Sequence, residues 1–113
     1  MTIQKITQLE ESSKINGTSL VGIVNVPYRT LVTLFGEPMP GCDYKTDAEW
    51  ALEIYTDYGD CVVATIYNWK NGKNYLGEEG TPVEEITRWN VGGHKTSAVS
   101  LVTAAIRNRI AVS

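Results

Sequence analysis

Aromatic and amide side chains gather in two short stretches of this chain. Tyr67 and Trp69 lie two residues apart, and Trp89 is followed directly by Asn90. Aromatic rings offer stacking surfaces for a nucleobase, and an amide can form hydrogen bonds with the edge of that base. If these residues converge at one end of a sheet, they predict a binding site for a base-containing ligand. The alternative interpretation is that Tyr67 and Trp89 pack in the core and that Trp69 packs under a loop.

Two arginines near the C-terminus, Arg107 and Arg109, are the candidate partners for a phosphate or pyrophosphate. They lie about 200° apart on a helix, so both cannot point into one pocket of their own subunit. One interpretation is that they balance the negative end of the helix dipole. The other is that one arginine serves its own subunit and the second reaches the pocket of a partner. Thr103 lies on the same polar stripe of that helix as Arg107.

The segment Val91–Thr96 precedes that helix and contains two glycines, followed by His94, the one histidine of the chain. Helix N-termini attract anions and glycines allow close approach, so this segment is a candidate phosphate-binding turn. It lacks the glycine spacing of the nucleotide-hydrolase loop, and a flexible surface turn is the alternative. The candidate ligand-binding residues are therefore Asn90, Arg107, Arg109, Trp89, Trp69, Tyr67, His94 and Thr103.

The residue patterns needed for catalysis are poorly represented. Glu49 and Glu53 share one strand face, but four strand residues span about 13 Å, which exceeds the ~5–9.5 Å of paired-carboxylate hydrolysis. His94 has no adjacent serine or cysteine to activate and no second histidine with which to share a metal. The sequence predicts that the protein is not an enzyme, with no catalytic residues, no metal and no cofactor.

Net charge and hydropathy exclude several classes of partner. The chain has a net charge of −3 and 42% hydrophobic residues. No broad basic face is expected for DNA or RNA, so an anionic ligand must meet a local cluster of cations. No apolar run approaches the ~18 residues of a membrane span, and the start of the chain is polar. We expect a cytosolic protein with Cys42 and Cys61 reduced.

The chain is expected to form a single α+β domain, 1–113, with a small and mostly antiparallel β-sheet, a short helix in the N-terminal half and a C-terminal helix. Residues 1–16 are interpreted as a weakly ordered or exchanged N-terminal arm, and 17–113 as the sheet core with its C-terminal helix. Residues 39–47 are expected to be loop. The expected elements are a strand over 20–26, a helix from Pro27 to Phe35, strands over 49–56, 61–69 and 85–91, and a helix over 97–110 capped by Thr96.

The central hairpin is expected to set the register of the sheet. A two-residue turn at Tyr58-Gly59 would place Trp50 opposite Tyr67. Asn71-Gly72 is a strong hairpin signal, which predicts that 73–76 folds back as a further strand. The face that carries Trp50 is apolar enough to be a core face. The opposite face of this hairpin is half apolar, so another element or, in the favoured interpretation, another subunit covers it.

Four segments within residues 20–102 together resemble a family of small phage proteins: Tyr28–Pro38, Lys45–Trp50, Val63–Lys70 and Trp89–His94. The pattern is similar to that of the phage anti-Thoeris sponge proteins. These proteins bind the cyclic ADP-ribose isomers made by bacterial TIR-domain enzymes and sequester them intact. The resemblance implies a β-sheet core with C-terminal helices, assembly into dimers or larger homo-oligomers, action in the host cytoplasm, and no catalysis. Some relatives also hold cyclic oligonucleotides at a separate site.

The resemblance therefore implies a phage anti-defence protein that binds and sequesters cyclic ADP-ribose-type signalling nucleotides, such as gcADPR, without cleaving them. One alternative is a small phage protein that inhibits a host defence enzyme by direct protein–protein contact. Another is a protein that sequesters cyclic oligonucleotides. The candidate site residues themselves rest on their chemistry and not on the family.

Overall fold

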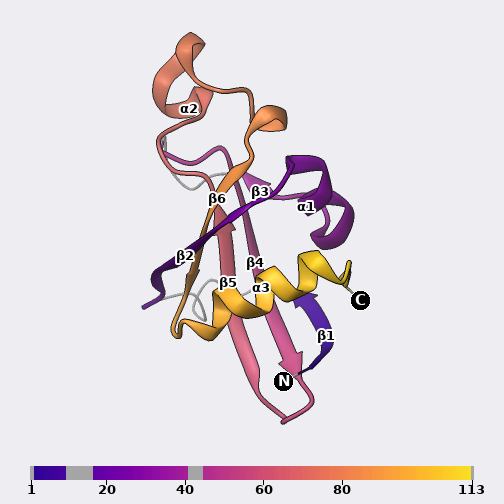
Figure 1. Ribbon diagram of the computed structural model, residues 1–113. Coiled ribbons are helices and arrows are strands. Elements are labelled where there is room, and N and C mark those ends of the chain that lie inside the picture. Colours follow the sequence, from indigo (N-terminus) through magenta and orange to yellow (C-terminus); the bar gives the residue numbers. More distant parts are fainter. Residues whose placement is uncertain (1, 10–16, 41–44, 113) are drawn as a thin grey trace.

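The computed structural model describes residues 2–9, 17–40 and 45–112 of the chain, which form an α+β fold (Figure 1). This confirms the expected fold class, with an antiparallel sheet, a helix in the N-terminal half and a C-terminal helix. In chain order the elements are β1 (Ile3–Gln8), β2 (Ser19–Asn25), α1 (Tyr28–Phe35), β3 (Met39–Pro40), β4 (Ala48–Thr56), β5 (Cys61–Tyr67), α2 (Lys73–Leu76), the 3₁₀ turns η2 (Gly77–Glu79) and η3 (Val83–Glu85), β6 (Arg88–Gly93) and α3 (Ser97–Arg107).

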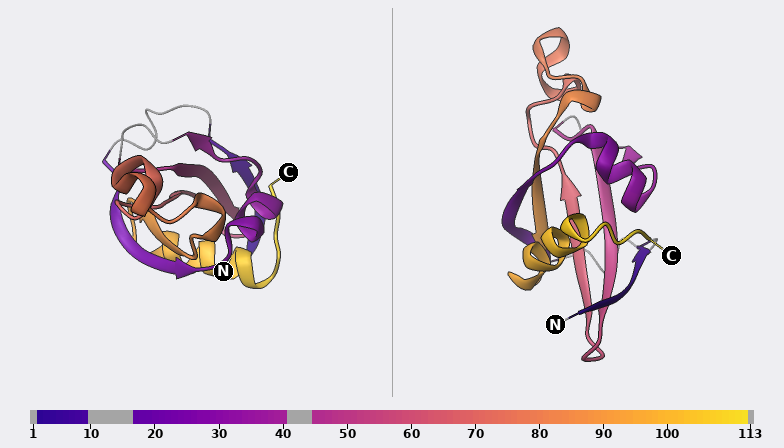
Figure 2. Two further views of the ribbon diagram at one scale, coloured as in Figure 1. Left: turned by 90° about the horizontal axis from the view of Figure 1, so that it is seen from above. Right: turned by 45° about the vertical axis from the view of Figure 1, so that its right-hand side comes forward.

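The sheet has the strand order β1-β4-β5-β6-β2, and the short strand β3 pairs with β4 on the same edge as β1. Each of these strand pairs is antiparallel. The sheet is strongly curled when seen from above, and the β4–β5 hairpin extends to the end of the molecule opposite α2 (Figure 2). α3 crosses β2, β5 and β6 on one face, which we call the core face. The opposite face is called the outer face.

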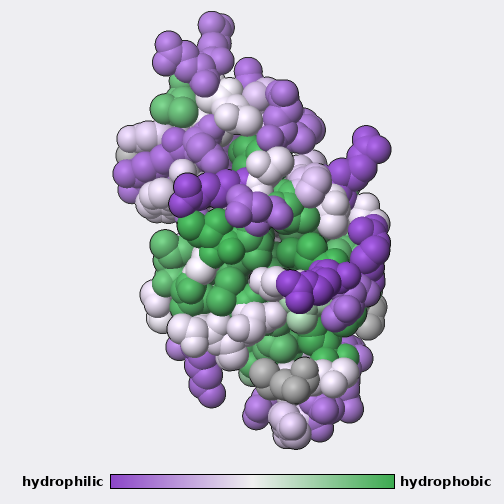
Figure 3. Space-filling model, viewed as in Figure 1, coloured by the Kyte–Doolittle hydropathy of each residue, from purple (hydrophilic) through white to green (hydrophobic). Residues whose placement is uncertain are grey.

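The core lies between the core face of the sheet and the helices α1 and α3. Trp89 is completely buried at its centre, where its ring stacks on Tyr28 at 6.2 Å and meets the edge of Trp50 at 5.3 Å. The Trp89 indole N–H donates to the Val26 carbonyl at 3.1 Å. Apolar surface gathers around α1 and α3, whereas both ends of the molecule are polar (Figure 3). The other fully buried apolar side chains include Ile6, Leu31, Phe35, Leu52, Ile54, Ile66, Val91 and Val102.

The register of the β4–β5 hairpin differs from the sequence prediction by one residue. The turn has three residues, 57–59, because Gly59 adopts a φ of +83° and the Thr56 N–H donates to the Asp60 carbonyl at 2.9 Å. Trp50 consequently pairs with Ile66 and not with Tyr67. A shift of one residue turns every side chain of a strand to the other face. The predicted assignment of β5 residues to the two faces is therefore wrong.

The second predicted hairpin is also wrong. Residues 73–76 form a turn of helix, α2, and Gly72 makes an isolated parallel bridge with Thr81. The reason is tertiary: Asp47 occupies the space beside Gly72, and an added Cβ there would lie 2.0 Å from Asp47 Oδ1. The Asn-Gly pair is thus packed against another loop and is not available for a two-residue hairpin turn.

The N-terminal arm is more ordered than the sequence predicted. Residues 3–8 form β1, which pairs with β4 of the same chain, and Ile6 is fully buried. The expectation of a weakly ordered arm therefore does not hold for residues 3–8, and exchange of the arm with a neighbouring copy stays a prediction. Residues 10–16 lie outside the described residues. β3 occupies part of the predicted loop 39–47. Cys42 also lies outside the described residues, so the reduced state of both thiols stays a prediction.

Most remaining elements agree with the sequence prediction within a few residues. α1 begins after Pro27 and ends at Gly36, whose φ is +86°. The last predicted strand is shifted, because residues 83–85 form η3 and β6 begins at Arg88. α3 ends at Arg107, and Thr96 makes no side-chain capping hydrogen bond.

Candidate functional site

A row of four side chains crosses the outer face of the sheet. The strand pairings place Glu49 opposite Tyr67, Tyr67 opposite Asn90, and Asn90 opposite Ile23. Side chains directly opposite each other on antiparallel strands have Cβ atoms about 4.5–5.5 Å apart. A carboxylate, a phenol, an amide and an apolar side chain therefore lie side by side on β4, β5, β6 and β2.

Trp69 extends this row beyond the end of β5. Its side chain is 45% exposed, and its ring meets the Tyr67 ring edge-on, with centroids 6.3 Å apart and 79° between the planes. The ammonium groups of Lys45 and Lys70 lie 5.4 and 5.8 Å from the centroid of the Trp69 ring. Lys70 also lies 5.6 Å from the centroid of the Tyr75 ring. Two cations are thus held against one accessible indole by cation–π contacts.

A hollow of about 360 Å³ opens beside Trp69. Its volume is at the lower end of the range of small-molecule sites. A third cation, Arg88, lines it together with the Asn90 amide, so the hollow adjoins a local cluster of positive charge on a chain of net charge −3. The residues that line the hollow are Leu20, Ile23, Trp69, Asn71, Arg88 and Asn90. We call the group Tyr67, Trp69, Arg88, Asn90, Lys45 and Lys70 the Trp69 surface.

The Tyr67 hydroxyl is a hydrogen-bond donor within this surface. Burial raises the pKa of the Tyr67 phenol, and the carboxylate of Glu49 raises this pKa further. Both causes disfavour the tyrosinate, because it is an anion. The phenol is consequently protonated at neutral pH and can donate to a carbonyl, hydroxyl or phosphate oxygen.

The structure brings together only part of the predicted site. Tyr67, Trp69 and Asn90 lie together at one end of the sheet, as the sequence predicted, but Tyr67 is on the outer face and not on the face of Trp50, where the predicted register had placed it. Trp89 does not join them, because it is sealed in the core and presents no ring surface to a ligand. The prediction that Trp89 forms a stacking wall is therefore wrong, and its alternative interpretation as a core residue is correct.

The remaining predicted residues lie elsewhere. Because α3 packs on the core face, Thr103 and Arg107 are on the opposite side of the sheet from the Trp69 surface, where Arg107 lines a shallow depression. The Thr103 hydroxyl donates to the Val99 carbonyl at 2.8 Å. Arg109 follows the end of α3 with a φ of 54°.

His94 lies beside a hollow of about 230 Å³ near the start of α3. The residues that line this hollow are Asp60, Cys61, Val62, Val63, His94, Lys95 and Ser97.

Three cations of the Trp69 surface were not predicted as site residues. Arg88 could have been found, because residues two apart on a strand share a face and Arg88 precedes Asn90 by two. Lys70 directly follows Trp69, but its φ of 60° is uncommon for a non-glycine residue and gives no sequence signal. Lys45 is more than 20 residues from Trp69 in the chain, and only the folded loops bring the two together.

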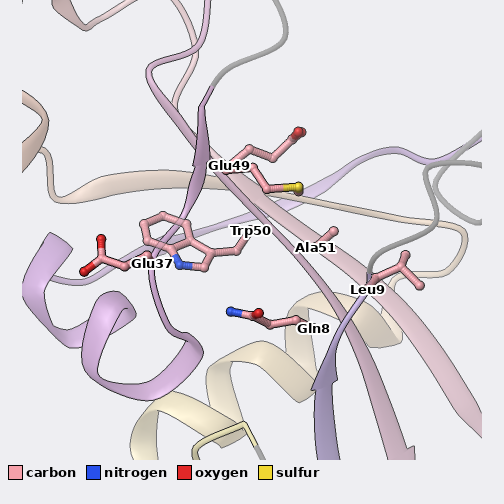
Figure 4. Close-up of a pocket in the computed structure, with 7 residues that line it drawn as sticks. Gln8, Leu9, Glu37, Glu49, Trp50 and Ala51 are labelled. Carbon is pink, nitrogen blue, oxygen red and sulfur yellow. The ribbon is translucent and has the colours of Figure 1, made fainter.

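A further hollow of about 270 Å³ lies between β1, β4 and the end of α1 (Figure 4). Its polar groups are used within the fold: the Gln8 side-chain amide donates to the Phe35 carbonyl at 2.6 Å, and the Trp50 indole donates to the Gly36 carbonyl at 2.8 Å. Glu37 and Glu49 contribute carboxylates to its lining. This hollow is less suited to an anion than the Trp69 surface.

No protein-family model matches the chain, and no curated protein is significantly similar to it. Among residues 2–9, 17–40 and 45–112, no helix is long and apolar enough to cross a membrane. The same residues contain no group of three or more histidine, cysteine, aspartate or glutamate side chains that could hold a metal ion.

Proposed function

We propose that this protein binds a small anionic nucleotide on the Trp69 surface and holds it without cleaving it. The observation that carries the proposal is the exposed Trp69 ring with the ammonium groups of Lys45 and Lys70 against it, next to Arg88 and Asn90. A ring of this kind can stack on a base, an amide can bind the base or ribose edge, and the cations can bind phosphates. The residues of the surface stack and attract charge, and no bond-breaking role is assigned to them.

The resemblance to the anti-Thoeris sponge proteins narrows the ligand. We propose that the ligand is a cyclic ADP-ribose-type signalling nucleotide and that the protein acts as a phage anti-defence protein in the host cytoplasm. A pyrophosphate between two riboses would meet the lysines and Arg88, and the adenine base would stack on Trp69. Cyclic oligonucleotides combine the same chemical groups, so they are the second ligand class to be tested.

A homo-oligomer forms part of this proposal. One stacked base is worth about 1–3 kcal/mol and a charge-assisted hydrogen bond about 1.5–3 kcal/mol, whereas association costs of order 4–15 kcal/mol. Tight capture therefore needs a more enclosed site than one open hollow. Leu20, Ile23 and Met39 are exposed apolar side chains on or beside the outer face. A second copy that covers them would enclose the ligand and could supply Arg107 or Arg109.

The proposal is tested by calorimetric titration with a cyclic ADP-ribose isomer and with a cyclic dinucleotide. After binding, heat denaturation should release the ligand with its mass unchanged. Trp69→Ala should lower the affinity by about 5- to 150-fold, which corresponds to one lost stack. Tyr58→Ala is the matched control, because it removes a 74% exposed ring at the far tip of the β4–β5 hairpin. Turnover of the ligand, or equal affinity of wild type and Trp69→Ala, would overturn the proposal.

The exposed apolar side chains Leu20, Ile23 and Met39 also favour a second candidate function. In this candidate the outer face binds and inhibits a host defence enzyme directly. Affinity capture from host lysate separates the two functions, since a nucleotide-sequestering protein should retain no host protein stoichiometrically. Capture of one host enzyme that is lost in Ile23→Asp and retained in Trp69→Ala would favour the inhibitor.

A further inference from the structure

Asn68 stands between Tyr67 and Trp69 in sequence, but its side chain points inward and is 0% exposed. Its Oδ1 accepts from the backbone N–H groups of Asp47 and Ala48 at 2.7 and 3.1 Å. Its Nδ2 donates to Asp47 Oδ1 at 2.9 Å and to Asn71 Oδ1 at 3.1 Å. Two donors and one carbonyl with two lone pairs are all that an asparagine amide offers, so every hydrogen-bonding position of Asn68 is used.

Asp47 extends this network to the start of α2. Its Oδ2 accepts from the backbone N–H of Asn74 at 3.2 Å, and the Asn74 amide donates to the Thr46 carbonyl at 3.0 Å. A backbone hydrogen bond from Lys70 to the Lys45 carbonyl, at 2.8 Å, runs beside it. Residues 45–48 and 68–74 are therefore tied into one unit. We call Asp47, Asn68, Asn71 and Asn74 the amide clamp.

The two loops that the clamp joins carry the two lysines on the Trp69 ring. Lys45 begins the first loop, and Lys70 lies two residues after Asn68 in the second. The φ of Lys70 is 60°, a backbone conformation that persists in a non-glycine residue when its surroundings determine it. The backbone hydrogen bond from Lys70 to the Lys45 carbonyl also joins the two loops. The clamp adds the side-chain hydrogen bonds that fix the loops over residues 46–48 and 71–74, so we expect its loss to loosen the common geometry of the two ammonium groups at the indole.

We propose that Asn68 is the positioning residue of the Trp69 surface: through Asp47 it holds Lys45 and Lys70 at the indole and so prepares the surface for an anion. Preorganised cations lose less side-chain entropy when a ligand binds, which increases affinity. The ligand in this inference rests on the proposed function above. The placement of positive charge at Trp69 does not rest on that function, and this placement can be measured without any nucleotide.

Tryptophan fluorescence quenching measures that placement. The chain has three tryptophans, and Trp50 and Trp89 are 2% and 0% exposed, so soluble quenchers report mainly on Trp69. Iodide is an anion and acrylamide is neutral. The ratio of iodide to acrylamide quenching therefore increases with positive potential at the Trp69 ring.

The test compares Asn68→Asp, Asn68→Leu and the reciprocal double variant Asp47→Asn/Asn68→Asp. Asn68→Asp places a second carboxylate against that of Asp47. Asn68→Leu keeps the size of the side chain but removes all four of its hydrogen bonds. In the double variant the amide and carboxylate exchange places, so the contact between residues 47 and 68 is kept and the net charge is unchanged. Each variant is checked by circular dichroism, and iodide and acrylamide are the probes.

We expect both single variants to lower the quenching ratio by about twofold or more, and the double variant to restore it. A double variant that folds but keeps a low ratio would overturn the inference, as would folded single variants with the wild-type ratio. If a single variant does not fold, the double variant still decides the question. Failure of wild type to bind a cyclic ADP-ribose isomer would instead overturn the proposed function and leave the quenching result standing.

Discussion

Glu49 and Tyr67 stand directly opposite each other on the outer face of β4 and β5, and the carboxylate helps to raise the pKa of the phenol. Burial is the larger cause and Glu49 the smaller one. This pair exists only because the hairpin has its three-residue turn, since the predicted register would have placed Trp50 opposite Tyr67. The pair therefore makes the pKa of the Tyr67 phenol a measurable consequence of the register of the sheet.

Replacing Glu49 by glutamine should lower the pKa of Tyr67 towards its ordinary value of 10.0. Because the folded-state pKa is raised, the stability linked to this proton is fully present below the pKa of the unfolded chain, and it is lost as pH rises through the folded-state pKa. Glu49→Gln should therefore show a smaller loss of stability at alkaline pH than wild type. Ultraviolet titration of tyrosinate and urea denaturation at several alkaline pH values measure the two effects, and Tyr67→Phe identifies the Tyr67 signal. An unchanged titration would show that the carboxylate does not act on the phenol.

Thr56→Val should stabilise the protein. Thr56 is 2% exposed, and its hydroxyl has no hydrogen-bond partner within the part of the chain that the structure describes. Valine has nearly the same shape and removes the buried polar group, so we expect a gain of about 1 kcal/mol in the free energy of unfolding. Thr103→Val is the control, because the Thr103 hydroxyl is hydrogen-bonded to Val99 and its removal should give no such gain. Urea denaturation measures both, and a less stable Thr56→Val protein would contradict this account.

Gly22→Ala should weaken the contact between β2 and α3. A Cβ at Gly22 would lie 2.6 Å from Val99 Cγ2, so the helix or the side chain must move. Overpacking of this kind costs about 1–3 kcal/mol. The double variant Gly22→Ala/Val99→Ala removes the contacts with both Cγ atoms and leaves only the approach to the Cβ of residue 99 at 3.0 Å. We therefore expect the two free-energy changes to be non-additive, with the double variant more stable than their sum predicts. If the free-energy changes measured by urea denaturation simply add, the destabilisation by Gly22→Ala does not come from its contact with Val99.

Mixing of variants tests whether a ligand site is shared between copies. In one chain Arg107 and the Trp69 surface lie on opposite sides of the sheet, so we expect Arg107→Ala to weaken binding only through a partner subunit. Trp69→Ala and Arg107→Ala should each lower binding of a cyclic ADP-ribose isomer. Refolding the two variants together should restore about one quarter of the sites, if random dimers form with two shared sites each. Wild-type binding by Arg107→Ala, or no recovery in the mixture, would contradict the shared site.

Local signals predicted the elements whose cause lies within a few residues. Pro27, Gly36 and the apolar spacing between them were sufficient to place α1, because a proline begins a helix readily and a glycine with positive φ ends it. β4 and β5 followed from their alternating and β-branched residues in the same way. The fold class could be predicted because it depends on the order of such elements.

The sequence was less informative where two structures share one local pattern. Asp57-Tyr58-Gly59-Asp60 is compatible with a two-residue or a three-residue turn, and only the packing of Ile66 and Ala64 in the core selects the second. The site shows the same limit. Tyr67, Trp69 and Asn90 could be grouped from their strands, but Lys45 approaches Trp69 across two loops that are distant in the chain and are joined by hydrogen bonds between Asp47 and Asn68.

The turn at residues 57–59 has a consequence for how this protein can change. A substitution at Tyr58 alters one exposed side chain, but a deletion of one codon would move the whole of β5 out of phase with β4. Tyr67 would then turn inward and Ile66 outward, and the surface that carries the aromatic row would be lost together with the core. We expect mutational libraries to accept many residue types at Tyr58 while rejecting almost every change of length.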